Sequence, residues 1–197
     1  MSKKKLIFLL KIGYIFVMFF NLGVNMEKAL QTNTKVNNYL DLLAKVFLGS
    51  LVIFLADIKI PFYPISFTAH TLAIFLIALT QRPKVALFSV LLYLGYESLG
   101  FSLSYGETTL WFLSNKAGYL VGFPIAAYVI SMLSSKISGF MAVAIGQAII
   151  YICGASWLAV SIGLENALYY GILIFIPSAF VKNYLAQFIS KWAKKRV

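Results

Sequence analysis

A lysine and a proline stand inside a long apolar stretch near the C-terminus of this 197-residue chain. Pro177 and Lys182 interrupt residues 166–192, and Ser178 precedes the lysine by four positions, so the two polar side chains share one face of a helix. An ionisable group inside a membrane segment is costly and therefore indicates a functional site. An ammonium group in such a place can hold a carboxylate or a carbonyl-rich head group.

Two arrangements of this last region fit the pattern. In the first, Pro177 kinks one continuous helix and Lys182 snorkels towards the membrane surface. In the second, Pro177 starts the final helix, because proline suits the first helical turn. Residues 166–176 would then form a re-entrant piece on the outer side, and Lys182 would face the bundle near the positive end of the helix dipole. The sequence leaves both arrangements open.

The composition predicts an all-α integral membrane protein. Hydrophobic residues make up 61% of the chain and charged residues 12%, which is about half the charged share of soluble domains. Long apolar runs separated by short polar gaps are typical of transmembrane helices. The predicted bundle has six spans, and they leave no room for a soluble domain: 40–56, 65–79, 85–99, 117–133, 137–162 and the interrupted region 166–192.

The net charge of +11 is distributed in a way that argues against a nucleic-acid partner. The basic residues gather in the first forty positions, in the turn at 81–84 and in the C-terminal tail. Four acidic residues occupy the alternate loops, namely Asp57, Glu97, Glu107 and Glu165. This is the positive-inside pattern, so we expect a multi-pass protein of the cell membrane with both ends of the six-helix domain in the cytoplasm and loops 57–66 and 100–116 outside.

An additional apolar segment at residues 6–24 does not fit this orientation, because a span there would invert the charge bias. We therefore predict that residues 1–37 are an extension, which lies in the membrane interface, acts as a leader, or reflects an upstream start with Met26 as the initiator. Residues 38–197 form the predicted six-helix domain.

Four runs in a fixed order carry a resemblance to a known family. They are Ile65–Ala73, Ala86–Leu94, Ala117–Phe123 and Pro177–Lys182. Over roughly residues 40–192 the chain resembles the BioY family, the substrate-binding (S) component of energy-coupling-factor (ECF) biotin transporters. The resemblance implies the six-helix S-component fold, an outward-facing site covered by the loops after the first and third helices, and release of biotin to the cytoplasm. It also implies either partnership with a transmembrane coupling protein and two ATPase subunits, or a solitary or self-associating protein, in contact with membrane lipid.

The chain departs from the family pattern at several places, among them the glycine-rich outer loop, which is Tyr105–Thr109 here, and the small-residue motif of the first helix. The family's Pro-Gly-Asp-x-x-Lys run keeps its lysine as Lys182, but the acidic position is Ala179. His70 replaces a glutamine, and Lys116 replaces the threonine of a Thr-Gly-Gly-Tyr run. The missing carboxylate removes an acceptor for ureido N–H groups, worth about 1.5–3 kcal/mol as a charged hydrogen bond. Glu107 in the outer loop is the candidate for a replacement acceptor.

The candidate substrate-binding residues have alternative roles in packing or at the membrane interface. The tyrosines can stack on or hydrogen-bond a bicyclic ligand, although interface belts also use tyrosine. His70 can equally be a helix-end packing or hydrogen-bonding residue, and Trp157 a belt residue rather than a pocket wall. The predicted site comprises Lys182, Tyr105, Glu107, Tyr119, Tyr93, His70 and Trp157.

The sequence gives no support for an enzyme. With one histidine and one cysteine, it cannot build a His/Cys metal cluster, and it has no phosphate-binding Gly-x-x-x-x-Gly-Lys-Ser/Thr loop. No cofactor is expected. The predicted function is high-affinity vitamin uptake, with biotin as the expected substrate. A different small vitamin-like substrate is the first alternative. A non-transporting membrane scaffold is the second, and it would place Lys182 on the lipid-facing surface.

Overall fold

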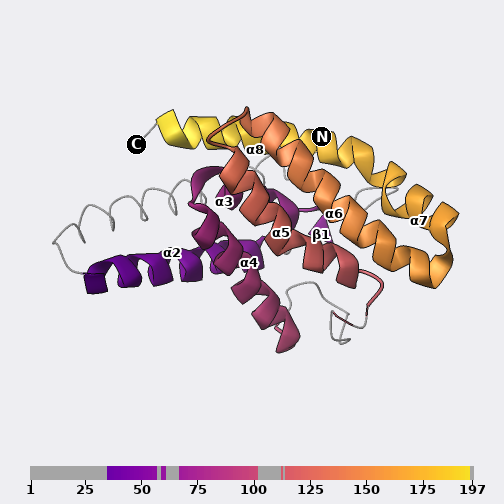
Figure 1. Ribbon diagram of the computed structural model, residues 1–197, viewed down its shortest axis with the longest axis horizontal. Coiled ribbons are helices and arrows are strands. Elements are labelled where there is room, and N and C mark those ends of the chain that lie inside the picture. Colours follow the sequence, from indigo (N-terminus) through magenta and orange to yellow (C-terminus); the bar gives the residue numbers. More distant parts are fainter. Residues whose placement is uncertain (1–34, 57–58, 61–66, 102–111, 113, 196–197) are drawn as a thin grey trace.

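The protein is an all-α bundle with one very short hairpin of strands (Figure 1). The computed structural model describes residues 35–56, 59–60, 67–101, 112 and 114–195. The elements in chain order are α2 (Lys35–Leu55), β1 (Lys59–Ile60), β2 (Phe67–Thr68), α3 (His70–Thr80), α4 (Pro83–Ser98), α5 (Ala117–Leu133), α6 (Gly139–Ile162), α7 (Leu164–Gly171), the 3-10 helix η2 (Leu173–Phe175) and α8 (Ile176–Lys195).

The six helices predicted from the sequence are present as α2, α3, α4, α5, α6 and α8. Helix α5 has the predicted bounds, and α2 begins five residues earlier than the predicted span 40–56. The additional N-terminal apolar segment at 6–24 lies outside the described residues. Within the described part of the chain, α6 and the helical run 164–195 are long and apolar enough to cross a membrane, whereas α3 and α5 are shorter apolar helices.

The predicted span 65–79 is wrong at its start. Phe67 and Thr68 are extended and pair antiparallel with β1, with Thr68 opposite Lys59 and Phe67 opposite Ile60, so α3 begins only at His70. Aromatic and β-branched residues suit a strand. A pair of two-residue strands is too short to give a readable alternation in the sequence.

Local sequence explains where the long helices begin and end. Helix α4 starts at Pro83, whose missing N–H is not needed in a first turn. Helix α6 is capped by Ser138, whose hydroxyl accepts a hydrogen bond from the Met141 N–H at 3.3 Å. It ends at Gly163, which has a φ of 82° that other residues rarely adopt.

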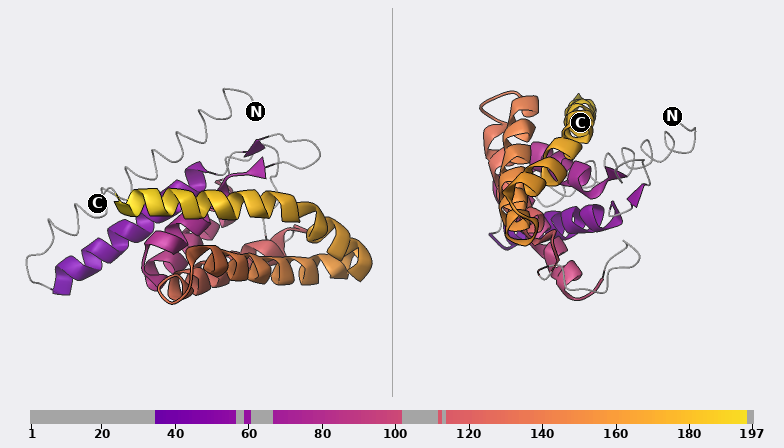
Figure 2. Two further views of the ribbon diagram at one scale, coloured as in Figure 1. Left: turned by 90° about the horizontal axis from the view of Figure 1, so that it is seen from above. Right: turned by 90° about the vertical axis from the view of Figure 1, so that its right-hand side faces the viewer.

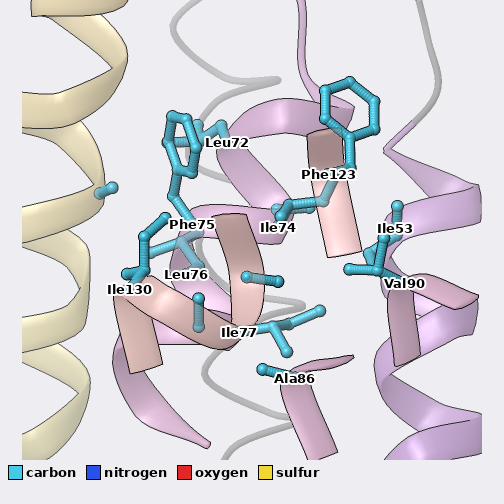
Figure 3. Packing of buried hydrophobic residues seen from close by; sticks show 14 of the residues in the cluster. Ile53, Leu72, Ile74, Phe75, Leu76, Ile77, Ala86, Val90, Phe123 and Ile130 are labelled. Carbon is cyan, nitrogen blue, oxygen red and sulfur yellow. The ribbon is translucent and has the colours of Figure 1, made fainter. Parts of the chain in front are cut away.

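Helix α3 lies at the centre of the bundle. Every residue from Leu72 to Leu79 is buried, and α2, α4, α5 and α8 pack around them. Figure 3 shows Leu72, Phe75 and Leu76 of α3 amid side chains of the neighbouring helices. Eleven residues rise only about 17 Å, so α3 is much shorter than the bilayer core of about 30 Å. By itself, α3 could therefore not cross that core.

The final helix starts at the turn that contains Pro177, as in the second of the two predicted arrangements. That residues 166–176 form a re-entrant piece on the outer side stays a prediction. Helix α7 packs back on α6, η2 follows, and α8 starts at Ile176 with Pro177 in its first turn. Figure 2 shows α7 at the far end of the molecule, where the chain turns from α6 into the returning α8. One continuous kinked helix is therefore not what the chain forms.

Helices α5 and α6 pack through small residues. Because Gly118 has no side chain, the backbone of Cys153 and the Cβ of Trp157 approach it closely, and Gly122 lies against Ile150 in the same way. Close approach at small residues is the usual basis of helix association in membranes, where apolar surface alone gives no preference for protein over lipid.

We expect Gly118→Ala to destabilise the protein by about 1–3 kcal/mol, because the new methyl group would overlap the Cys153 carbonyl oxygen and the Trp157 side chain. Gly95→Ala is the matched control, since a Cβ there meets nothing within 4 Å. That control should gain about 0.5–1 kcal/mol from helix propensity alone. Thermal unfolding of the purified protein in detergent measures both changes. Equal effects of the two substitutions would contradict the close packing of α5 against α6 at Gly118.

Candidate functional site

The ammonium group of Lys182 is held inside the bundle. Lys182 is only 9% exposed, and its Nζ donates a hydrogen bond to Thr71 Oγ1 at 2.8 Å. Lys182 lies in the second turn of α8 and Thr71 in the first turn of α3, and the two residues are 111 positions apart in sequence. The lysine thus faces the protein interior, and the snorkelling arrangement is wrong.

His70 occupies the first position of α3, next to Thr71. Its ring packs on Phe123 of α5, with ring centroids 5.3 Å apart and planes inclined by 59°. Lys182 and Lys116 both interact electrostatically with His70. The N-terminus of α3 is therefore where side chains of α3, α5 and α8 meet.

The backbone adds to the positive field at this point. The N-cap of α3, Ala69, is fully buried and provides no side-chain hydrogen bond to the first-turn N–H groups. The N-cap of α5 is Lys116, which also provides none. Helix N-termini carry partial positive charge, and together with the two ammonium groups they favour an anionic or carbonyl-rich ligand.

Tyr119 connects the site to the turn before α8. Its hydroxyl donates to the Gly171 carbonyl at 2.9 Å, and its ring lies against Gly154 of α6. Lys116, Tyr119 and Phe123 follow each other at i, i+3 and i+7, so they occupy one face of α5. Tyr119 thus fixes that face of α5 against α6 and α7.

Of the remaining predicted site residues, the structure describes Tyr93 and Trp157. Tyr93 is 2% exposed and belongs to the hydrophobic core, whereas Trp157 is 48% exposed on α6. Tyr105 and Glu107 lie outside the described residues, as do most of the two loops expected to cover the site. The role of all four residues in ligand binding stays a prediction.

Three residues at the site were missed as site residues by sequence reasoning, namely Thr71, Phe123 and Lys116. Thr71 follows His70 directly, and Phe123 closes the Ala117–Phe123 run, but neither position reveals its partner on another helix. Lys116 was visible only as a departure from the family pattern. In the described residues, no group of three or more His, Cys, Asp or Glu side chains could hold a metal ion.

A family model, described as the BioY family, matches residues 11–197. The chain belongs to the BioY family. It is 35% identical over 154 residues to a probable biotin transporter BioY of Rickettsia prowazekii, a match that covers 74% of this chain and 79% of that protein. Proteins described in the same words from Pyrococcus horikoshii and Bacillus subtilis are 28% and 26% identical, over 69% and 70% of this chain and 85% and 79% of their own lengths.

The fold agrees with this assignment. A crystal structure of the S-component for biotin from an ECF-type ABC transporter superposes with a TM-score of 0.67 at 19% identity, covering 83% of this chain and 95% of the other. The predicted S-component fold and family are thereby confirmed. The prediction that the chain is not an enzyme agrees with its membership of a transporter family.

The Lys182–Thr71 contact can be tested by a double-mutant cycle. Thr71→Val keeps the side-chain shape but removes the hydroxyl that accepts from the ammonium group, so we expect a loss of about 1.5–3 kcal/mol of unfolding free energy. In a Lys182→Met background the same change should cost much less, because no buried charge remains to be satisfied.

Thr80→Val is the matched control for this cycle. Thr80 is half-buried on the same helix, and its hydroxyl donates to the Leu76 carbonyl within that helix, at 2.7 Å. Its effect should be the same with and without Lys182. Chemical unfolding in detergent measures each variant, and strictly additive effects of Thr71→Val and Lys182→Met would contradict the contact.

Proposed function

We propose that this protein binds biotin and carries it across the cell membrane as the S component of an ECF-type transporter. The observation that carries the proposal is a lysine buried at the N-terminus of a central helix, within a chain of the BioY family. A passive scaffold would be expected to place Lys182 on the lipid-facing surface, where its ammonium group could reach water, rather than against Thr71 inside the bundle.

The proposed ligand contacts follow from the positive charges of Lys182 and Lys116. A carboxylate of the substrate would lie between Lys182 and Lys116 at the N-terminus of α3, with Phe123 as an apolar wall. Closure of the outer loops would exclude water and strengthen these interactions. Ala179 leaves the ureido end without the carboxylate acceptor that other family members use, so the cationic end supplies more of the affinity in this chain.

We propose that the site opens to the outside and that both ends of the six-helix domain are cytoplasmic. The start of α2 and the end of α8 lie at one end of the molecule, and α7 lies at the other (Figures 1 and 2). The first end carries Lys136, Lys191 and Lys194, whereas α7 carries Glu165 in its first turn. This distribution supports the orientation through the positive-inside rule.

Partners and domain limits are part of the same proposal. Because the sequence contains no phosphate-binding loop, energy for release would come from a transmembrane coupling protein and two ATPase subunits, unless copies of the chain act together without them. The division into residues 1–37 and a membrane domain at 38–197 remains a prediction, since residues 1–34 lie outside the described part of the chain.

Binding of radiolabelled biotin to the detergent-purified protein tests the substrate and both lysines. Lys182→Gln should weaken binding about 10- to 100-fold, the equivalent of one charged hydrogen bond. Lys116→Thr should weaken it less, because that exposed ammonium group is screened by solvent. Both losses should shrink when biotin amide replaces biotin, since the amide has no negative charge.

Lys136→Gln is the matched control for that measurement, because Lys136 is exposed and lies in the turn between α5 and α6. It should leave the affinity for biotin unchanged. A folded wild-type protein that binds no biotin would refute biotin as the substrate, and the same experiment would then be run with other vitamins as competitors.

Cysteine labelling tests the orientation. With the single cysteine replaced by Cys153→Ser, a membrane-impermeant maleimide should label Asn115→Cys in intact cells, because this exposed residue precedes α5 at the outer end. Ser135→Cys, exposed in the turn that follows α5, should react only after the membrane is permeabilised. The reverse pattern would show that the site faces the cytoplasm.

A further inference from the structure

An apolar groove lies on the outside of the bundle between α6 and α8. It is a shallow, open groove of about 400 Å³, lined by Phe140, Phe180, Val181, Tyr184 and Leu185. Phe180, Val181 and Tyr184 are 53–66% exposed, so the groove opens onto the surface that faces the membrane. It is separate from the candidate substrate site, because Lys182 points from the opposite face of α8 towards α3.

Polar contacts behind the groove fix its walls. Asn183 is 7% exposed, and its Nδ2 donates to the Phe140 carbonyl at 3.2 Å, which ties the first turn of α6 to the middle of α8. One turn further along α8, the Gln187 side chain lies against Gly139, which has no side chain of its own. The position of Phe140 beside Tyr184 is therefore set by the fold.

Basic residues lie at one end of this groove. Lys136 precedes α6, and Lys191, Lys194 and Lys195 end α8; all four are exposed. Because Gly139 contacts Gln187, the turn before α6 and the last turns of α8 lie at the same end. We call Lys136, Lys191, Lys194 and Lys195 the basic rim.

The groove and the basic rim are continuous along α8. Tyr184, Phe188, Lys191 and Lys195 are all exposed and follow each other at i, i+4, i+7 and i+11, so they share one face of the helix. Between Tyr184 and Lys191 the helix rises about 10 Å. Along α8 the apolar groove is thus followed by a row of lysines. A phospholipid has the same order of groups, with apolar acyl chains followed by a charged phosphate.

Among the described residues, Asp41 near the start of α2 lies at this end of the molecule, and it pairs with Lys45 of its own helix at 2.8 Å. From residue 108 to the C-terminus the sequence contains a single acidic residue, Glu165. It lies in the first turn of α7, at the opposite end of α6 from the rim. The local charge is therefore strongly positive, and it favours anionic over zwitterionic lipid head groups.

We propose that the groove and the basic rim together bind one anionic phospholipid, with an acyl chain in the groove and the phosphate near Lys136 and Lys191. The proposal differs from general attraction of a basic protein to an acidic membrane, because it requires the groove and two particular lysines. It does not depend on the identity of the transported substrate.

The test uses the full chain purified in a neutral detergent, with phosphatidylglycerol and phosphatidylcholine of identical acyl chains. Phosphatidylglycerol should raise the unfolding temperature by several degrees, and native mass spectrometry should show one tightly retained copy. Phosphatidylcholine should have little effect at the same concentration. Glycerol phosphate, which carries the same charge without acyl chains, should not raise the unfolding temperature.

Two double variants separate the rim from charge in general. Lys136→Gln/Lys191→Gln should weaken retention of phosphatidylglycerol at least tenfold while the lipid-free unfolding temperature stays unchanged. Arg82→Gln/Lys84→Gln removes the same charge from the exposed residues of the α3–α4 turn and should leave retention unchanged. Val181→Trp, which fills the groove but keeps every lysine, should also displace the lipid.

Equal losses in the two double variants would overturn the proposal in favour of diffuse charge attraction. Equal stabilisation by the two lipids would overturn it as well, since the rim would then have no role. Unchanged retention in Val181→Trp would show that the groove does not hold the acyl chain.

Discussion

The enclosure of α3 is the constraint on which the rest of this structure depends. Its residues from Leu72 to Leu79 are apolar on every side, so the helix has no face that could be left in water. It is also too short to cross the bilayer core, and its backbone ends must find partners inside the protein. Helices α2, α4, α5 and α8 supply the cover, and Ser131 of α5 donates a hydrogen bond to the Gln81 carbonyl that follows α3, at 2.6 Å.

The position of the site follows from that enclosure. Helix α3 is shorter than the helices around it. Its first residues, His70 and Thr71, therefore contact side chains of α5 and α8. An ammonium group buried there carries a large desolvation cost, which the bond to Thr71 offsets only in part. In the proposed function, a ligand carboxylate would offset much more of that cost.

The outer surface obeys different rules from the core. Large apolar side chains are exposed along α2, α6 and α8, among them Leu43, Ile152 and Phe188, as expected where lipid is the solvent. Contact between helices instead relies on small residues such as Gly118 and Gly122. The two ends of the bundle differ in charge, and both the proposed orientation and the proposed lipid site rest on that difference.

The sequence by itself determined the membrane class, the number of helices and the family, because each of these rests on local composition and on ordered runs of residues. It also limited the region around Pro177 to two arrangements, a kinked continuous helix or a helix that starts at the proline. Both follow from the local effect of proline on its own turn and its immediate neighbours. The strand pair that delays α3 was not foreseen, because its pairing joins residues across a proline-rich loop. Likewise, Tyr93 could be named as an aromatic but not assigned to the core.

Only the tertiary structure decided between snorkelling and burial for Lys182. The lysine and Thr71 are 111 residues apart, and no periodicity in either helix shows which residue will stand opposite the other. That pairing depends on how α3 is enclosed and on the turn that α7 and η2 impose before α8. Local sequence sets what each helix can offer, whereas the packing of separate helices sets which groups meet, because burial is a property of the whole bundle.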